Sequence, residues 1–298
     1  MNISQLRTFV TVIEAGSFSE AARQMGISQP AVTMQVQALE SDTGATLLDR
    51  RYRRIDLTEA GRVLLPYARK VIAELECARE QIAALSGSIT GRLVIAASTT
   101  PGVYVVPRLL GPFLAQNPEV GVTITVHDTA EVIEAVEQGR ANFGVTGAIV
   151  KGAKVSFEPI GTDELVVICA PTSSFAGRKD VPLTDLADSD WVVRESGSGT
   201  RQVSEGFLSH NGVDPADLRI AVELGTGEAI VSAVEGGLGV AMLSSHVVEK
   251  ALALGTVVRI DLASPPAVRT YFAVLPKGTP TRAAEAFSAF LRERLAEK

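Results

Sequence analysis

Strand-like and helix-like segments alternate from about residue 91 to the C-terminus, and this alternation constrains the fold more than any other feature. Short apolar runs typical of buried strands cover Arg92–Ala97, Val122–Val126, Phe143–Thr146, Leu165–Ala170, Trp191–Arg194, Ile220–Leu224, Val240–Leu243 and Thr270–Val274. Helical patterns between them cover Val103–Gln116, Glu131–Gln138, Arg201–Asn211, Gly227–Val234, His246–Leu254 and Arg282–Ala296. Strands that alternate with helices predict an α/β domain with a largely parallel sheet.

About two hundred residues of this pattern are enough for two lobes. We expect lobe I to cover 92–162 and 266–298 and lobe II to cover 163–265, with the chain crossing between them near Gly161 and Ser264. Two linking strands form a hinge, through which a ligand held between the lobes can shift an open–closed equilibrium.

Polar loops follow several of these strands and open helices. Backbone N–H groups at helix N-termini, together with hydroxyls, suit a small anion with several acceptor oxygens. The candidate effector-binding residues are Ser98, Thr99, Thr100, Gly147, Ser196, Gly197, Ser198, Thr200, Arg201 and Thr226. Any one of these loops, taken alone, fits ordinary helix capping better than a ligand site. The Gly197–Arg201 stretch is neither a phosphate-binding P-loop nor a complete dinucleotide fingerprint.

The first forty residues carry three helical patterns separated by glycines. Apolar residues at helical spacing precede Gly16, a second helix is expected over Phe18–Met25, and Ser28-Gln29-Pro30 opens a third that runs to about Glu40. Two helices, a glycine-containing turn and a further helix form the arrangement that places its last helix in the major groove of DNA. An ordinary three-helix bundle with a polar outer face fits the periodicity equally well.

If the third helix reads DNA, its polar face supplies the contacts, because Gln and Thr side chains can hydrogen-bond base edges. The candidate residues on this helix are Ser28, Gln29, Pro30, Thr33, Met34 and Gln37, with Gln35 expected on the same face.

An arginine-rich segment after these helices favours the DNA-binding interpretation. Leu47–Leu57 predicts two short strands around a tip, a hairpin known as a wing, whose Arg50, Arg51, Arg53 and Arg54 are candidates for phosphate and minor-groove contacts. The net charge of −6 argues weakly against nucleic-acid binding. However, the first ninety residues hold ten basic and ten acidic side chains, so the acidity lies entirely in the second part.

These N-terminal motifs resemble the LysR-type transcriptional regulators. The resemblance rests on Gln5–Phe9, Gly16–Ala22, Ser28–Thr33, Leu39-Glu40 and Leu57–Gly61, which stand in the family's order and spacing. Met34-Gln35 departs from many relatives, so the operator sequence cannot be transferred. The resemblance implies a winged helix-turn-helix domain, a linker helix and a two-lobed effector module similar to periplasmic binding proteins. The Ser196–Arg201 loop looks most like the branch that regulates sulfur assimilation or carbon fixation.

A long helix is expected to join the two parts, with Thr58 as its cap and an end near Leu85. A heptad seam with charged flanks is typical of a helix that pairs with its own copy, although a single domain could also bury it. The residues predicted to dimerise are Leu64, Val71, Leu75 and Ile82. We therefore expect a DNA-binding domain over 1–58, a dimerisation helix over 59–87 and an effector-binding domain over 88–298.

The sequence argues against several other classes of protein. It has no nucleophile–base motif or metal-ligand spacing, so we expect neither catalysis nor a metal nor a cofactor, only a small anionic effector. Cys77 and Cys169 are expected to be small buried hydrophobes in a reducing cytoplasm, and we expect no secretory signal and no membrane span. The expected partners are promoter DNA with an interrupted palindrome and further copies of the chain, as dimer and tetramer, with RNA polymerase as a further candidate. The alternative is a stand-alone small-molecule binding or transport-type protein, which leaves the first ninety residues unexplained.

Overall fold

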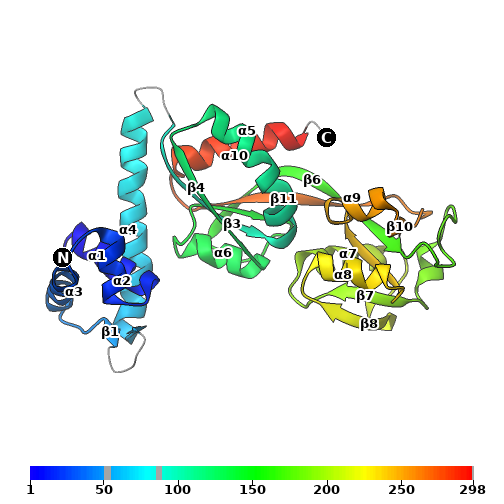
Figure 1. The fold of residues 1–298 in the computed structure, drawn as a ribbon, viewed down its shortest axis with the longest axis horizontal. Helices are drawn as coiled ribbons and strands as arrows, with labels where there is room; N and C mark the ends of the chain where they lie inside the picture. The colour runs from blue at the N-terminus through cyan, green and yellow to red at the C-terminus, as the bar shows by residue number, and fades with distance from the viewer. Residues whose placement is uncertain (50–54, 85–88, 297–298) are drawn as a thin grey trace.

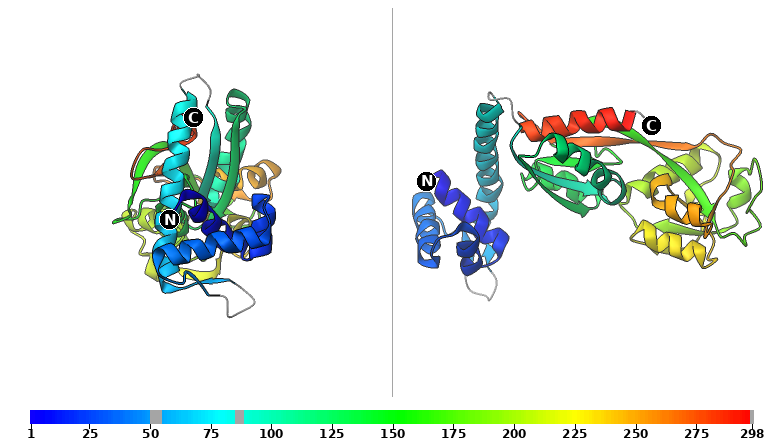
Figure 2. Two further views of the ribbon diagram at one scale, coloured as in Figure 1. Left: turned by 90° about the vertical axis from the view of Figure 1, so that its left-hand side faces the viewer. Right: turned by 45° about the horizontal axis from the view of Figure 1, so that its top comes forward.

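The computed structural model describes residues 1–49, 55–84 and 89–296. An N-terminal helical domain and a long helix stand beside a two-lobed α/β module (Figure 1). A second viewing direction separates the same three parts (Figure 2). No helix within the described residues is long and apolar enough to cross a membrane.

Three helices and a two-stranded sheet form the N-terminal domain. Helices α1 (Ile3–Ala15), α2 (Phe18–Met25) and α3 (Gln29–Thr43) each begin at a side-chain cap, supplied by Asn2, Ser17 and Ser28. Gly26 ends α2 in the left-handed conformation at φ 66°, which a glycine adopts without strain. The apolar stripes of all three helices meet in one core around Phe9, Val32 and Leu39.

Strands β1 (Leu48–Asp49) and β2 (Asp56–Leu57) pair antiparallel, with Leu48 opposite Leu57. They flank the arginine-rich tip that the sequence predicts. Arg50, Arg51, Arg53 and Arg54 themselves lie outside the described residues.

Helix α4 (Glu59–Ala84) connects the N-terminal domain to the α/β module. Thr58 caps it, because its hydroxyl oxygen accepts the Gly61 N–H at 3.0 Å. The first turns of α4 pack on the N-terminal core, which buries Ala68 and half-buries Leu64. The predicted seam is therefore divided: its early residues are covered within the chain, whereas Val71 and Ile82 are exposed.

The second half of α4 contacts lobe I. The Cys77 sulfur lies 3.7 Å from the Thr279 carbonyl oxygen, and burial raises the pKa of the thiol, which fits the predicted packing role. Glu80 is also buried at this junction, against Gly91. Its Oε2 atom has no hydrogen-bond partner, and burial raises the pKa of the Glu80 carboxyl group.

A mixed sheet runs through both lobes of the α/β module. The described strands are β3 (Gly91–Ser98), β4 (Val120–His127), β5 (Phe143–Thr146), β6 (Val155–Cys169), β7 (Asp190–Arg194), β8 (Arg219–Leu224), β9 (Val240–Ser244), β10 (Val258–Arg259) and β11 (Ala267–Pro276). Their order is β4-β3-β5-β11-β6-β9-β7-β8, with β10 paired to β6. β3 pairs parallel with β4 and β5 in lobe I, and β7 pairs parallel with β8 and β9 in lobe II. The other pairs are antiparallel: β6 and β11 with each other along their length, β11 with β5, and β6 with β9 and β10.

The β6–β11 pair is longer than the sequence predicts, and it forms the connection between the lobes (Figure 1). Ile160 and Tyr271 belong to the lobe I core, whereas Leu165 and Ala267 belong to the lobe II core. The second crossover therefore lies around Arg269, beyond the expected position near Ser264. The apolar strand pattern predicts only the ends of β6 and β11, because the residues of these strands that lie between the lobes are polar.

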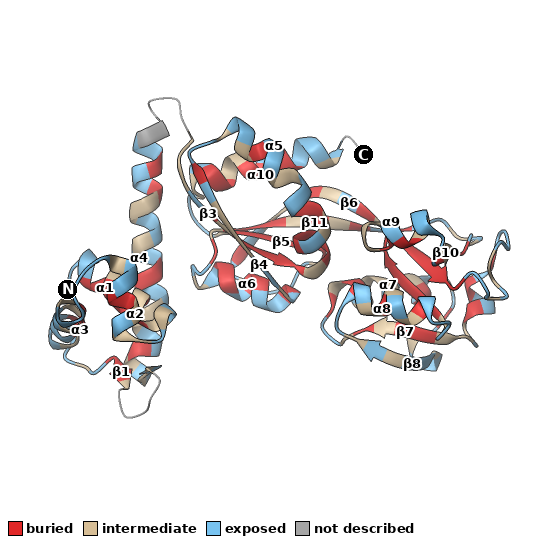
Figure 3. Cartoon of the chain, in the orientation of Figure 1, coloured by how far each residue is buried: buried red, intermediate tan, exposed pale blue. Residues whose placement is uncertain are grey.

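Helices cover both faces of each lobe. Lobe I carries α5 (Val106–Gln116), α6 (Thr129–Glu137) and α10 (Arg282–Ala296), and lobe II carries α7 (Gly199–His210), α8 (Gly227–Glu235) and α9 (Ser245–Leu254). Burial is concentrated where these helices face the strands (Figure 3). Short 3-10 turns lie at Leu183–Leu186 and Pro215–Asp217.

A π-helical turn, η1 (Pro101–Val105), replaces the start of the helix predicted over Val103–Gln116. The Val106 N–H bonds back to the Pro101 carbonyl, and Pro107 has no N–H with which to continue an α-helical ladder backwards. Such turns are frequent at functional sites, and this one follows Ser98-Thr99-Thr100.

Candidate functional site

A narrow cavity lies between the two lobes, at the carboxyl ends of β3, β5 and β7. It is lined by Ser98, Thr99, Thr100, Asp128, Thr129, Gly147, Arg194, Glu195, Ser198, Gly199, Thr200 and Arg269. The free space is about 20 Å³, room for the centre of little more than one water molecule. A larger ligand therefore requires the lobes to separate or a side chain to move.

Six of the residues predicted from sequence line this cavity: Ser98, Thr99, Thr100, Gly147, Ser198 and Thr200. Loops from distant parts of the chain meet there because ligand sites in open α/β sheets form at the carboxyl ends of strands.

Ser196, Gly197, Arg201 and Thr226 do not line the cavity. Gly197, at φ 90°, occupies the turn that the Ser198 N–H closes onto the Glu195 carbonyl at 3.1 Å. The Thr226 hydroxyl accepts the Ala229 N–H at 3.2 Å and so caps α8. Ser196 is exposed. For Gly197 and Thr226, the local turn and capping roles explain the residue type.

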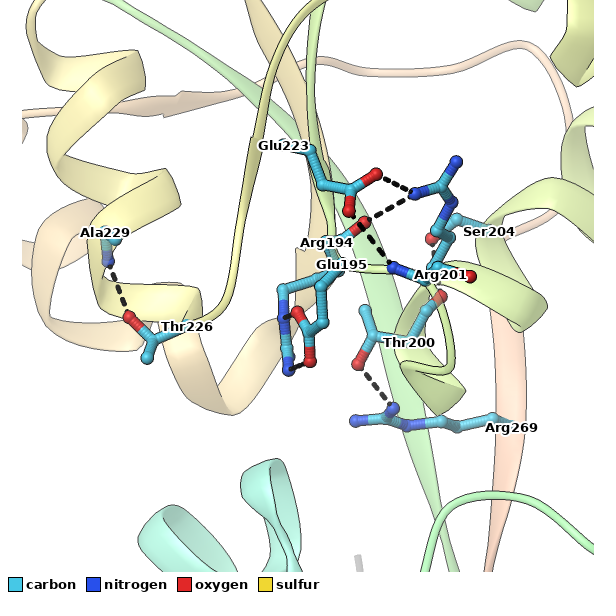
Figure 4. A network of polar contacts seen from close by, with 10 residues as sticks. Arg194, Glu195, Thr200, Arg201, Ser204, Glu223, Thr226, Ala229 and Arg269 are labelled. Atoms are coloured by element: carbon cyan, nitrogen blue, oxygen red, sulfur yellow. Dashed lines mark hydrogen bonds and ion pairs between the residues drawn. The ribbon is translucent and has the colours of Figure 1, made fainter. Parts of the chain in front are cut away.

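Arg201 turns away from the cavity toward two carboxylates. Its Nε donates to Glu205 at 2.7 Å and its Nη1 to Glu223 at 2.5 Å and to the Arg194 carbonyl at 3.1 Å (Figure 4). The Arg201 guanidinium lowers the pKa of Glu223. This arginine holds the start of α7 to the end of β8.

A buried ion pair that the sequence reasoning missed supports the cavity floor. The Arg269 Nε donates to Asp163 at 2.7 Å, and the side chains of Arg269 and Asp163 are 3% and 0% exposed. The Ser244 hydroxyl donates to the second Asp163 oxygen at 2.9 Å. Asp163 and Arg269 are register partners on β6 and β11 at the crossover between lobes. The sequence signal for this pair is a charged residue between two apolar stretches on each of the two strands.

Arg269 also reaches the cavity. Its Nη1 donates to the Thr200 hydroxyl at 2.9 Å, a contact visible in Figure 4, and its Nη2 lies 3.3 Å from the Tyr271 hydroxyl. The guanidinium carbon sits 5.1 Å from the centre of the Tyr271 ring, within cation–π range. These partners fix the orientation of a positive charge at the wall of the cavity.

A second arginine, Arg194, pairs with its own chain neighbour. Its Nε and Nη2 donate to the two carboxylate oxygens of Glu195, each at 2.7 Å (Figure 4). The Arg194 side chain is 5% exposed, whereas that of Glu195 is 33% exposed. The sequence predicted Arg194 as the last residue of a strand, and neither Arg194 nor Glu195 was among the candidate effector-binding residues.

The N-terminus of α7 faces the same space without a side-chain cap. Ser198 is its N-cap residue but makes no capping hydrogen bond, and Thr100 makes none at the start of η1. The first N–H groups of a helix have no partner within the helix, so they remain available to a bound anion. By contrast, Asp128 and Glu131 cap α6 reciprocally.

The lobes also touch on the α5 and α9 side. Arg108 of α5 lies 2.8 Å from Glu249 of α9. The Tyr104 phenol of η1 contacts the Glu228 carboxylate of α8, and burial together with this carboxylate raises the pKa of Tyr104. The lobes therefore also meet beside the cavity, through η1 and α5 of lobe I and α8 and α9 of lobe II.

Most of the residues predicted to contact DNA from the third helix are exposed to solvent. Ser28, Gln29, Pro30, Met34 and Gln37 are exposed, and Thr33 is half-buried. Ser28 caps the helix, and the Gln29 Oε1 accepts the Ser19 hydroxyl at 2.8 Å. Gln35 was wrongly placed on this face: its Oε1 accepts the hydroxyls of Ser4 and Thr8, so it packs against α1.

No group of histidine, cysteine and acidic side chains in the described part of the chain could hold a metal ion. The two buried cysteines are free thiols, and burial raises the pKa of the Cys169 thiol.

Comparison with known proteins defines the class. Residues 3–62 match the family described as "Bacterial regulatory helix-turn-helix protein, lysR family", and residues 86–296 match "LysR substrate binding domain". The chain belongs to the LysR family of transcriptional regulators, a family of DNA-binding proteins and not of enzymes. The stand-alone binding-protein alternative is therefore set aside.

Two relatives of known name match most of the chain. The chain is 32% identical over 292 residues to the RuBisCO operon transcriptional regulator of Allochromatium vinosum, covering 98% of this chain and 95% of that protein. It is 32% identical over 247 residues to the HTH-type transcriptional regulator CysL of Bacillus subtilis, covering 83% and 82%.

Solved structures resemble it as well. The CcmR regulatory domain from Synechocystis, in complex with 2-PG, has a TM-score of 0.63 at 28% identity, covering 69% of this chain and 98% of that one. Full-length CbnR complexed with its target DNA has a TM-score of 0.68 at 25% identity, covering 98% and 99%.

Proposed function

We propose that this regulator controls its promoter in response to a small anionic metabolite bound between lobes I and II. The observation that carries the proposal is the convergence, in one cavity, of Arg269, Arg194 and the uncapped N-terminus of α7. Fixed guanidinium groups and free helix N–H groups together favour an oxyanion. The 2-PG bound by CcmR, and the relatives named as RuBisCO regulators, support a phosphorylated acid from carbon metabolism.

Helix α4 is proposed to pair with its copy in a second chain. Val63, Tyr67, Val71 and Ile82 are exposed along it by 62%, 66%, 46% and 69%. An apolar stripe of this kind on one face of a long helix favours a helix partner. We assign 1–58 to DNA binding, 59–87 to dimerisation and 88–298 to effector binding, with a tetramer formed from two dimers.

Each dimer carries two third helices and two arginine-rich tips. Two copies joined by α4 suit an interrupted palindrome in promoter DNA, since linking two weak half-site contacts raises the overall affinity. RNA polymerase is the proposed further partner at the promoter, and the cytoplasm is the proposed location.

The effector assignment is tested by titrating the full-length protein with 2-phosphoglycolate, a compound with phosphate and carboxylate groups. Thr100→Val and Ser198→Ala remove hydroxyls from the cavity wall and should abolish the response while leaving promoter binding intact. Ser196→Ala, two residues away but exposed outside the cavity, is the matched control and should respond as wild type. If both cavity variants respond to 2-phosphoglycolate as wild type does, the effector binds elsewhere in the protein.

The DNA assignment is tested on the chain's own promoter by fluorescence anisotropy over a salt series. Arg53→Ala should weaken binding to every sequence and reduce the salt slope by about one, because it removes one phosphate contact. Gln29→Ala should also relax base preference. Equal losses on promoter and random DNA for both variants would contradict these roles.

A further inference from the structure

Arg194 already holds a carboxylate in the geometry that an anionic ligand would need. Both ends of its fork are taken by Glu195 at 2.7 Å, and both side chains line the cavity between the lobes. A bidentate pair satisfies an arginine with two parallel, charge-assisted hydrogen bonds. An effector that uses this Nε–Nη2 edge of Arg194 must therefore take the place of Glu195.

The two partners differ in how freely they can move. Arg194 is 5% exposed and its carbonyl oxygen also accepts Arg201, so the guanidinium stays in the wall and needs a counterion. Glu195 is 33% exposed and follows the last residue of β7, so its carboxylate can turn toward water without breaking the strand. The exchange of partners is thus a rotation of one side chain.

This exchange costs every ligand the same Arg194–Glu195 pair, so the ligand's own charge and contacts decide whether binding is measurable. A ligand carboxylate would replace the Glu195 carboxylate with a group of the same charge and hydrogen-bonding capacity, which yields little net free energy. A phosphate monoester carries about two negative charges at pH 8 and three acceptor oxygens, so it can bind Arg194 and the free N–H groups of α7 together. Asp163 does not interfere, because Arg269 and Ser244 already occupy its oxygens.

We propose that Glu195 is a built-in competitor for the effector, one that lowers the affinity of every anion that uses this edge of Arg194, so that a dianionic phosphate binds measurably where a carboxylate does not. The inference rests on the proposed effector site and adds the residue that sets its affinity threshold. It also accounts for the small free space in the cavity, since Glu195 occupies part of the volume that the ligand would fill.

The test compares 2-phosphoglycolate with succinate, a molecule of similar length in which a carboxylate replaces the phosphate. Calorimetric titration of full-length protein at pH 8 should give measurable wild-type binding of 2-phosphoglycolate and at least about tenfold weaker binding of succinate. Glu195→Gln keeps the shape of the side chain but removes its charge. It should tighten the binding of both compounds about tenfold, because each ligand displaces the same charged competitor.

Two further variants make the outcome decisive. Glu205→Gln removes a carboxylate from Arg201, outside the cavity, and should leave both affinities unchanged. Glu195→Ala should reproduce the tighter binding, which excludes a special effect of the amide. If wild type binds 2-phosphoglycolate and neither Glu195 variant binds succinate more tightly, the competitor role is wrong while the proposed site stands. If wild type and both Glu195 variants bind neither compound, the proposed anion site and the competitor role both fail.

Discussion

Asp163→Asn should destabilise the protein strongly, because it leaves a buried arginine without its counterion. Asp163 is fully buried, and its two oxygens accept Arg269 at 2.7 Å and Ser244 at 2.9 Å. The substitution keeps the size of the side chain and removes only its charge. Breaking a buried pair in this way costs about 3–5 kcal/mol. For a module of this size, each kcal/mol corresponds to about 2–4 °C, so the melting temperature should fall on the order of 10 °C.

The neighbouring residue supplies the matched control. Glu164 pairs with Arg259 on the surface, where the two side chains are 34% and 49% exposed. Surface pairs contribute about 0–1 kcal/mol, so Glu164→Gln should shift the melting temperature by at most a few degrees. The two variants remove adjacent carboxylates of β6 and differ mainly in burial.

A double variant separates charge from packing. Asp163→Leu combined with Arg269→Met removes both charges together and should recover much of the lost stability, since no unpaired charge remains buried. Thermal and urea unfolding of the full-length protein, followed by circular dichroism, measures all four proteins. If Asp163→Asn loses no more stability than Glu164→Gln, or if the double variant is the least stable, the reasoning about the buried pair is wrong.

The remaining predictions concern the rest of the chain. Burial raises the pKa of Glu80, so the folded state disfavours the Glu80 carboxylate and loses stability as the pH rises from the ordinary Glu pKa through the raised one. Glu80→Gln should therefore raise the melting temperature more at pH 7 than at pH 4. An equal rise at both pH values would contradict this. Val71→Asp places a charge on the exposed stripe of α4 and should convert dimers to monomers in sedimentation velocity, whereas unchanged sedimentation would remove α4 from the interface. Gly239→Ala should cost at least about 2 kcal/mol of unfolding free energy, because φ is 149° and the new Cβ would lie 2.0 Å from the Asp190 carbonyl oxygen. Gly206→Ala, in open space within α7, should instead stabilise by about 0.5–1 kcal/mol in the same measurement.

The sequence predicts the elements well wherever their signals are local. β5 spans the predicted Phe143–Thr146, and α10 spans the predicted Arg282–Ala296. Both are bounded by nearby changes in polarity: β5 is a short run in which every residue is buried, and α10 repeats apolar residues at helical spacing. The start of the α5 region is less regular, because the π-helical turn at Pro101–Val105 depends on an unusual combination of two prolines.

The site was predictable only in part. Polar residues that follow a strand and open a helix, such as Thr100 and Ser198, reach the cavity because strand ends gather at one edge of a sheet. Chemically similar residues on the same loops, such as Ser196 and Arg201, turn elsewhere. A loop's composition does not specify which side chains point inward.

By itself, the sequence determined the order of the elements, the helix caps, the two-part organisation and the family. These properties depend on residues that lie within a few positions of each other. Only the tertiary structure decided which charges meet. Arg269 contacts Thr200 across 69 positions and Asp163 across 106, and Arg194 takes its own neighbour as a partner. Such pairings follow from strand register and from the competition among all nearby acceptors for each buried guanidinium, and neither is encoded in a local pattern.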